Sequence, residues 1–337
     1  MSALRPALRY AQRPLDTSAA RQCAGVSLVE LMVALVIGSL LIIGAVTVYM
    51  QSRNTYRTNE TTARLQEIAR YALDNIEPDV RLAGFWGLTN RPDFIDNRAT
   101  PSETREAVDA DVDTNCGVNW TVDLMTPIDG RDATDTGGDG YDLACAGINP
   151  VDWSDVLIVR RASSNTVALA ANQMQIQSNR MRAVVFNDGV LPSGFDAASS
   201  ETRNLSVHAY YVSEVLPSPN GIRQYALRRQ TLVGSATGPI IRDEEIVPGV
   251  EDMQVQFGID DGPRDGNVDR YVNPGAVPAG ARIASVRIWL LVIAEDIEVG
   301  FTNERDWEYA NADHGPQNDP RRRMLISKTI QIRNAPI

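Results

Sequence analysis

Residues 25–50 read GVSLVELMVALVIGSLLIIGAVTVYM, and this stretch decides how the rest of the chain is organised. The residues from Leu31 to Met50 carry no charge. At about 1.5 Å per helical residue they span about 30 Å, the thickness of a bilayer's hydrocarbon core. Glu30 is the single charged residue of the stretch, and a carboxylate at the bilayer centre costs about 2.5–3.5 kcal/mol. The sequence therefore predicts a membrane helix with an acid near its start, and this acid needs a partner.

The residues before this stretch are basic. Residues 1–24 contain four arginines and one aspartate, a net charge of +3. Basic flanks stay in the cytoplasm, so we expect a single-pass protein whose remaining chain lies outside it. A secretory signal peptide has its small-residue cleavage site after the apolar run, whereas Ala24 and Gly25 lie before it. Cleavage after Gly25 would remove the basic leader, with Cys23, and leave the apolar helix on the protein.

The helical pattern continues beyond the membrane segment. In RLQEIARYALDNI (residues 64–76) one stripe at spacings of three and four holds Leu65, Ile68, Ala72 or Leu73, and Ile76. Pro78 marks the expected end, because proline removes a helical hydrogen bond. The expected organisation is a leader (1–25), a long helix (26–78, with 26–50 in the membrane) and a headgroup (79–337).

The headgroup is rich in strand signals. β-branched and aromatic runs separated by turn residues occur at residues 155–161, 166–171, 182–187, 205–214, 223–230, 251–260, 282–295 and 324–334. VLPSPNG (215–221) connects two of them as a hairpin. No second long amphipathic helix follows the first. We therefore expect an α+β fold, with one long helix packed on an antiparallel sheet.

The cysteines and histidines are too few for a multi-ligand Cys/His metal site, since the chain has 3 Cys and 2 His. Cys116 and Cys145 follow the membrane segment, and outside the cytoplasm such a pair oxidises. We expect a disulfide that closes this loop, worth about 3.5 kcal/mol in the chain-entropy view. The two cysteines lie too far apart for a C-x-x-C redox motif. His208, in a strand-like run, and His314, in a polar loop, are interpreted as structural or surface residues.

Two loops rich in aspartate are candidate Ca²⁺ sites. DDGPRDGNVDRY (260–271) contains Asp260, Asp261, Asp265 and Asp269, and DADVDT (109–114) contains Asp109, Asp111 and Asp113. Carboxylate oxygens suit Ca²⁺, but neither loop has the EF-hand spacing. Asp–Gly turns between strands are the alternative, and the pattern favours them. No other cofactor is expected.

An enzyme and a nucleic-acid-binding protein are both disfavoured. The chain has no G-x-S-x-G, Walker or H-E-x-x-H motif. Its net charge is −11, or −14 after removal of the leader, which repels a polyanion. The densest basic patch, Arg321–Arg323, is interpreted as a solvated entry to a strand.

Residues Gly25 to Leu31, with the basic leader and the apolar helix, resemble the type IV prepilins. The resemblance implies that a prepilin peptidase cuts after Gly25 and that the new N-terminus, Val26, is methylated. Most members have Phe where this chain has Val26. The resemblance makes Glu30 the assembly residue. Its carboxylate would pair with the α-amine of a neighbouring chain, since two buried opposite charges cost less together than either does alone.

DVRLAGFWG (79–87), IVPGVEDMQVQFGID (246–260) and RRRMLISKTIQIRN (321–334) resemble the PilW family of type IV minor pilins. The resemblance implies a low-copy subunit that primes pilus assembly near the tip and supports twitching motility and adhesion. The implied partners are other minor pilins, the major pilin, a tip-associated adhesin, the prepilin peptidase and the inner-membrane assembly platform. The implied locations are the inner membrane, with the headgroup in the periplasm, and then the filament at the cell surface.

Two alternatives stay open at the level of sequence. The J-type minor pseudopilins of type II secretion share the same plan of leader, helix and sheet. A binding module at the pilus tip, for an adhesion target or DNA, would keep the same anchor and differ only in the headgroup surface.

Overall fold

The computed structural model describes residues 25–99, 120–133, 149–215, 221–262 and 265–334. The chain divides into two compact units, Met1–Arg57 and Thr58–Ile337. The boundary lies inside one helix, so the two parts of this helix are described separately. The second unit is the headgroup together with the helical residues from Thr58 onward.

The predicted long helix is confirmed as α1, Leu28–Leu82, with 55 residues. Within the headgroup, its buried residues include Leu65, Ala72, Leu73 and Ile76 of the predicted stripe. Ala69 extends the same stripe, and Ile68 is partly buried against it. The spacing of apolar residues therefore identified the face that packs on the headgroup.

The predicted end of the helix at Pro78 was wrong, because α1 continues to Leu82 with Pro78 inside it. Proline in a helix interior costs about 3 kcal/mol, since its missing N–H leaves a carbonyl one turn back without a donor. The turn after Pro78 carries Asp79 and Val80, both buried. Burial of this turn offsets the penalty, which is a tertiary effect that a local pattern does not contain.

The helix packs against two sheets, where the sequence pattern suggested one. The larger has eight strands in the order β1-β5-β4-β6-β3-β2, with β7 pairing to β6 and β8 to β7. Its strands are β1 (Ile95–Asp96), β2 (Ile128–Arg131), β3 (Val156–Ala162), β4 (Ala171–Ser178), β5 (Ala183–Asp188), β6 (Glu201–Val215), β7 (Gln224–Gly234) and β8 (Pro239–Pro248). Within the described residues, its strands pair antiparallel except for the short parallel β1–β5 pair.

The smaller sheet is antiparallel and has the order β10-β9-β11-β14. Its strands are β9 (Val250–Asp260), β10 (Arg270–Val272), β11 (Arg282–Ile293) and β14 (Arg323–Gln331). A two-stranded ribbon, β12 (Glu308–Tyr309) with β13 (Ala312–Asp313), lies in the connection between β11 and β14. Together with α1 these sheets give the predicted α+β class.

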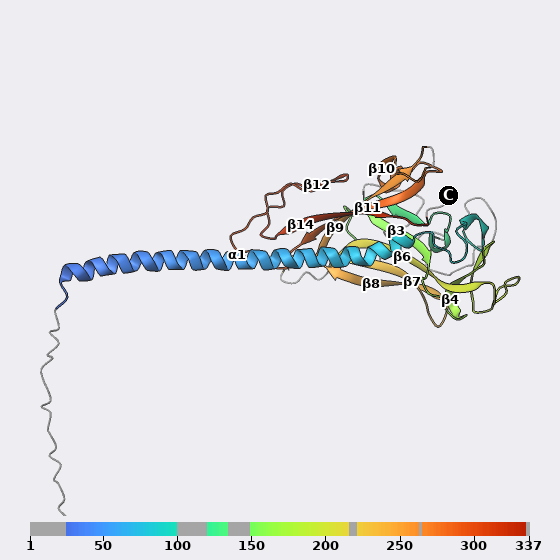
Figure 1. The fold of residues 1–337 in the computed structure, drawn as a ribbon, viewed down its shortest axis with the longest axis horizontal. Coiled ribbons are helices and arrows are strands. Elements are labelled where there is room, and N and C mark those ends of the chain that lie inside the picture. Colours follow the sequence, from blue (N-terminus) through green and yellow to red (C-terminus); the bar gives the residue numbers. More distant parts are fainter. Residues whose placement is uncertain (1–24, 100–119, 134–148, 216–220, 263–264, 335–337) are drawn as a thin grey trace, which may run out of the picture. The chain divides into compact units, whose positions relative to one another are not determined.

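The main core lies between the headgroup part of α1 and the two sheets. Leu73 and Ile76 of the helix share one buried cluster with Met253, Val255 and Phe257 of β9 and with side chains of β6, β7 and β11. In Figure 1, β9 and β14 lie above the helix and β7 and β8 below it. The helix therefore packs against both sheets.

A second core covers the other face of the larger sheet. Alternate residues of β3 take part in different cores: Leu157 and Val159 pack in the main core, Val156 and Ile158 in the second. The second core also takes up Trp86, Trp120, Val122 and Leu124 from the segment that follows the helix. The larger sheet is thus buried on both faces at its centre.

Most predicted strands are confirmed, and the pairing of β6 with β7 from Val215↔Gln224 to His208↔Thr231 confirms the hairpin. The prediction for residues 166–171 was wrong, since β4 begins at Ala171. The Gln175 side chain holds the preceding segment instead, through the Ala168 carbonyl at 2.9 Å and the Ala170 N–H at 2.9 Å. The charged, half-exposed strand β8 was missed because its composition gives no period-two apolar signal.

We expect Pro78→Ala to stabilise the headgroup by about 1–3 kcal/mol, because alanine restores the missing helical N–H. Urea unfolding of the full-length chain in detergent micelles measures this change. A neutral or destabilising result would show that the turn 79–82 needs the proline ring, contrary to this account.

Candidate assembly site

The first candidate region is the N-terminal part of α1. It carries a segment long and apolar enough to cross a membrane, judged by length and composition. None of that segment is buried in the protein, and side chains such as Leu41 (69 %) and Ile42 (65 %) are exposed. Exposed apolar surface of this size needs a lipid or protein environment.

Glu30 has an observed role at the start of this helix. Its Oε2 accepts a hydrogen bond from the backbone N–H of Ser27 at 3.0 Å. Ser27-x-x-Glu30 is the pattern of a capping box, in which the acid covers an N–H that the helix leaves free. The sequence analysis missed this signal, which was readable from the spacing. Gly25 and Val26 precede the helix and are exposed, so the predicted cleavage bond is accessible.

The second candidate region is the end of α1, where a buried carboxylate fastens the helix to the larger sheet. Asp79 is 4 % exposed. Its Oδ1 accepts from Arg161 of β3 at 2.6 and 2.9 Å, and its Oδ2 from the hydroxyl of Tyr210 at 2.5 Å and from the ring Nδ1 of His208, both on β6. Three side chains from two strands thus converge on one helical residue.

The electrostatics of this cluster favour an ionised Asp79. Burial raises the pKa of Asp79, but the hydrogen bond from His208 and the charges of His208 and Arg161 outweigh it and hold the pKa well below its usual range. Burial and the Asp79 carboxylate raise the pKa of Tyr210 well above its ordinary value, so Tyr210 remains a donor. The cluster is a stable ion pair with hydrogen bonds around it.

Ser206, His208 and Asp79 stand in the order of a nucleophile, base and acid, with 3.3 Å between the Ser206 hydroxyl and Nε2 of His208. A catalytic acid of this kind has the histidine as its main partner. Here Asp79 is already neutralised by Arg161 and also holds Tyr210. The arrangement is therefore one that positions the helix, and we assign it no catalytic role.

The smaller sheet has its own fastening to the helix. Nζ of Lys328 on β14 lies 2.6 Å from Oε2 of Glu77. The backbone N–H of Arg333, beyond β14, donates to the carbonyl of Arg81 at 3.1 Å. Polar contacts to both sheets therefore meet within the last two turns of α1.

The third candidate region is the connection between β11 and β14, residues 294–322, here called the strap. Trp307 and Tyr309 of the strap pack on Leu291 of β11. The Tyr309 hydroxyl and Nε2 of His314 donate to Oδ2 of Asp252, at 2.7 and 2.8 Å. Asp252 is fully buried on β9, so the strap is held to the smaller sheet by apolar packing around a buried carboxylate.

The interpretation of Arg321–Arg323 as a solvated patch was wrong. Arg323 is 9 % exposed, and its guanidinium contacts Glu251 at 2.5 and 2.9 Å and Asp319 at 2.6 and 2.9 Å. Arg321 is also buried, and Arg322 pairs with Glu298. The acids lie up to 72 positions away in the sequence, which is why the patch looked unpaired.

The two matches to known families fall on these regions. Residues 209–334, which contain the strap, β9 and β14, match the family described as Type IV Pilus-assembly protein W, PilW. Residues 20–46 match the prokaryotic N-terminal methylation motif. Residues 209–334 form a PilW domain. The chain thus carries a PilW-type segment together with an N-terminal methylation motif.

Two further comparisons were made. The chain is similar to the type IV-like pilin TTHA1219 from Thermus thermophilus, with 16 % identity, 56 % of this chain and 82 % of that chain covered, and a TM-score of 0.26. This similarity is too low to support any argument. The comparison with curated proteins gives no match.

The predicted Ca²⁺ loop of the PilW domain forms turns. Oδ2 of Asp269 accepts the N–H groups of Asp261 and Gly262 at 3.0 and 2.9 Å, and Asp265 accepts that of Asn267. Among the described residues no group of three or more Asp, Glu, His or Cys is placed to hold a metal ion. Ca²⁺ binding by this loop stays a prediction.

Other predictions fall outside the described residues. They concern Cys116 and Cys145, with their disulfide, and the acidic loop of Asp109, Asp111 and Asp113. These stay predictions. Trp86 and Trp120 are buried in the second core, whereas Trp153 is 36 % exposed.

We expect Asp79→Asn to destabilise the headgroup by about 3–5 kcal/mol, because it leaves the partly buried Arg161 without its charge partner. Chemical unfolding of the full-length chain in detergent measures the loss. Asp74→Asn is the matched control on the same helix, since Asp74 forms an exposed pair with Arg70 and should change stability by less than about 1 kcal/mol. Equal effects of the two substitutions would contradict the role given to Asp79.

The strap should be held to the smaller sheet more firmly at acidic pH. The hydrogen bond to Asp252, with the negative charges nearby, raises the pKa of His314 above its usual value of 6.5 although burial opposes this. The stability that His314 contributes is then complete below pH 6.5 and is lost as the pH rises through the raised folded pKa. Thermal melts of wild type and His314→Gln should therefore differ most at low pH and converge at high pH. A difference independent of pH would contradict this.

Proposed function

We propose that this protein is a minor pilin that primes type IV pilus assembly and enters the filament at low copy near the tip. The observation that carries the proposal is a methylation motif at residues 20–46 that runs into an apolar helical segment with no buried residues. Such a helix needs other helices or lipid around it. The PilW domain supports a role in the pilus.

Glu30 would act twice in this proposal. Before assembly it caps its own helix through the Ser27 N–H. In the filament its carboxylate pairs with the methylated α-amine of Val26 on a neighbouring subunit. That pairing removes the cost of an isolated charge in an apolar surrounding and sets the register of adjacent helices.

The proposed partners are the other minor pilins, the major pilin and a tip-associated adhesin. The prepilin peptidase and the inner-membrane assembly platform act before incorporation. The proposed path leads from the inner membrane, with the headgroup in the periplasm, to a surface filament that serves twitching motility and adhesion. The PilW domain would supply the surface by which the subunit meets its neighbours.

Glu30→Gln and Glu30→Ala separate the two roles of this acid. Glutamine keeps the capping acceptor and loses the charge, whereas alanine loses both. We expect both variants to be cleaved after Gly25 and neither to enter filaments. Mass spectrometry of the N-terminus and immunoblots of sheared filaments measure the two steps. Normal incorporation of Glu30→Gln would show that capping, and not charge pairing, is what matters.

A deletion strain tests the class of filament. Loss of surface pili, with Val26 found as a methylated N-terminus in wild-type filaments, supports the proposal. Intact pili with a loss of protein secretion would indicate a pseudopilin instead. An uncut Gly25–Val26 bond would overturn the proposal altogether.

A further inference from the structure

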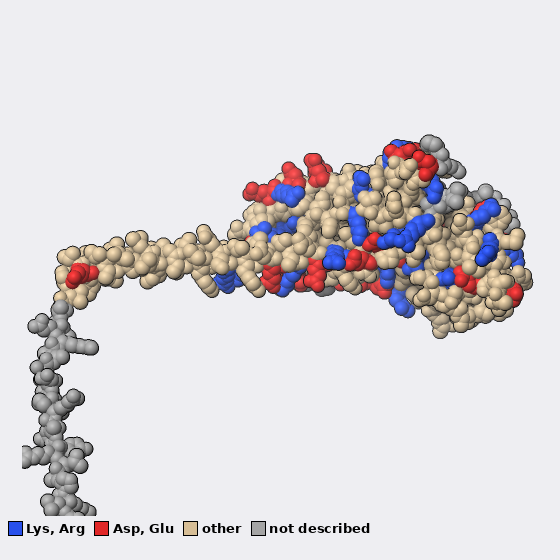
Figure 2. All heavy atoms as spheres, in the orientation of Figure 1, with Lys and Arg blue, Asp and Glu red and all other residues tan. Residues whose placement is uncertain are grey.

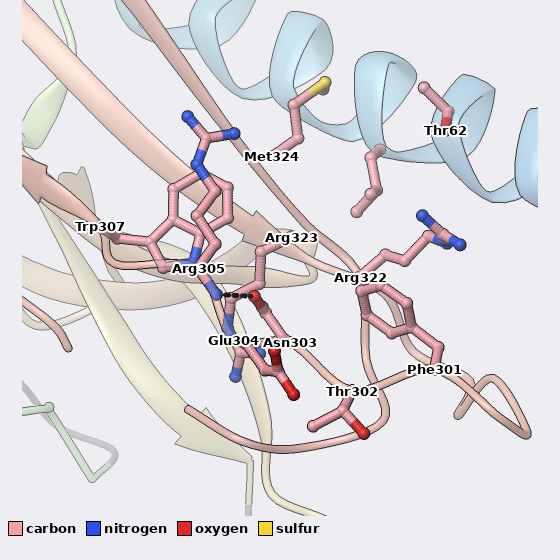
Figure 3. Close-up of a pocket in the computed structure, with 11 residues that line it drawn as sticks. Thr62, Phe301, Thr302, Asn303, Glu304, Arg305, Trp307, Arg322, Arg323 and Met324 are labelled. Carbon is pink, nitrogen blue, oxygen red and sulfur yellow. Dashed lines mark hydrogen bonds between the residues drawn. The ribbon is translucent and has the colours of Figure 1, made fainter. Parts of the chain in front are cut away.

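The strap encloses a hollow against the helix that no step described so far uses. This pocket has a volume of about 330 Å³. Its apolar wall combines three elements: Leu65 of α1, Met324 of β14, and Phe301 and Trp307 of the strap. Figure 3 shows the strap residues on one side of the pocket and the helix on the other.

Backbone hydrogen bonds join two distant parts of the strap, so the pocket is already shaped before any partner binds. The backbone N–H of Asn303 donates to the Asp319 carbonyl and that of Asn318 to the Asn303 carbonyl, both at 2.9 Å. Arg322 stacks on Phe301 with 4.3 Å between the guanidinium carbon and the ring centre. A partner that binds here meets a surface that is largely organised in advance, which lowers the entropic cost of binding.

Apolar side chains extend into solvent on the turn that leads to this pocket. Val299 is 92 % exposed and Ile297 is 51 % exposed. Trp307, which lines the pocket, is 4 % exposed, and its ring N–H has no hydrogen-bond acceptor within the described part of the chain. A docked segment would cover the aliphatic groups, and its backbone carbonyl could satisfy the indole.

The surroundings of the pocket are acidic. Exposed acids on the strap are Glu295, Asp296, Glu304, Asp306, Glu308 and Asp313. Arg305 is the exposed base among them, while Arg322 and Arg323 are committed to Glu298, Glu251 and Asp319. Figure 2 shows acidic side chains gathered over this segment. The field at the pocket rim therefore favours a positively charged partner.

We propose that the strap and its pocket dock a basic segment of a different pilus subunit. An apolar side chain of that segment enters the pocket and covers Val299, and its Lys or Arg side chains meet the strap acids. This inference rests on the proposed function. It adds which surface of the PilW domain binds the neighbouring subunit, and it specifies that the bound segment is basic with an apolar side chain.

Photocrosslinking in cells tests the proposal on the full chain. A photoreactive phenylalanine analogue at Val299 should crosslink to another pilus subunit, at a peptide rich in Lys or Arg. The same analogue at Met181, which is 81 % exposed on the turn between β4 and β5, is the matched control and should give little product. A crosslink only to a second copy of this chain, or no difference between the two positions, would overturn the proposal.

Charge reversal gives an independent measurement. Glu304→Lys with Glu308→Lys should lower the Val299 crosslink roughly tenfold, because each reversal turns an attraction to a basic partner into a repulsion. Matched reversal at Asp188 and Asp196, exposed acids at the end of β5 and in the segment after it, should leave it unchanged. An equal loss of crosslinking from both pairs of substitutions would overturn the proposal that the partner segment is basic.

The two proposals fail in different ways. If Glu30→Gln blocks incorporation while the strap variants crosslink and assemble as wild type does, the docking surface is wrong and the pilin function stands. If deletion of the gene leaves pili intact, the pilin function itself is wrong.

Discussion

The headgroup depends on one buried carboxylate at the end of a long helix. Asp79 is paired with Arg161 and receives hydrogen bonds from His208 and Tyr210, so one helical turn is bound to two strands of the larger sheet. A buried ion pair is not stabilising in itself, because desolvation opposes it. Its consequence is positional, since a helix rotated or shifted along its axis would leave the buried Asp79 and the partly buried Arg161 without partners. The apolar stripe supplies the burial, and this cluster sets the register.

Ion pairs and hydrogen bonds between distant residues also hold the smaller sheet and the strap in position. Glu77 meets Lys328, Asp252 holds Tyr309 and His314, and Arg323 lies between Glu251 and Asp319. Each contact joins a residue of one element to a distant part of the chain. Directional polar pairs of this kind resist sliding of one element over another, where apolar packing alone is less specific.

Local signals predicted the fold well where one physical effect dominated. The apolar run, the basic leader and the stripe from Leu65 to Ile76 identified the helix and its buried face. The β-branched runs identified most strands, and VLPSPNG the hairpin. The failures have a common cause. Pro78 lies inside the helix because its following turn is buried, residues 166–171 are held by the Gln175 side chain, and Arg321–Arg323 find acids that are remote in sequence.

The sequence by itself predicts the anchor of this protein and the bond at which the proposal has it processed. Those properties depend on composition, period and charge over about twenty-five neighbouring residues, and the methylation motif covers the same region. Only the tertiary structure decided which charges pair, how the helix joins two sheets and where the strap forms its pocket. Asp79 and Tyr210 stand 131 positions apart, and Arg323 and Glu251 stand 72 apart. No local pattern encodes such pairs, because their energies exist only once the chain has brought them together and removed the water between them.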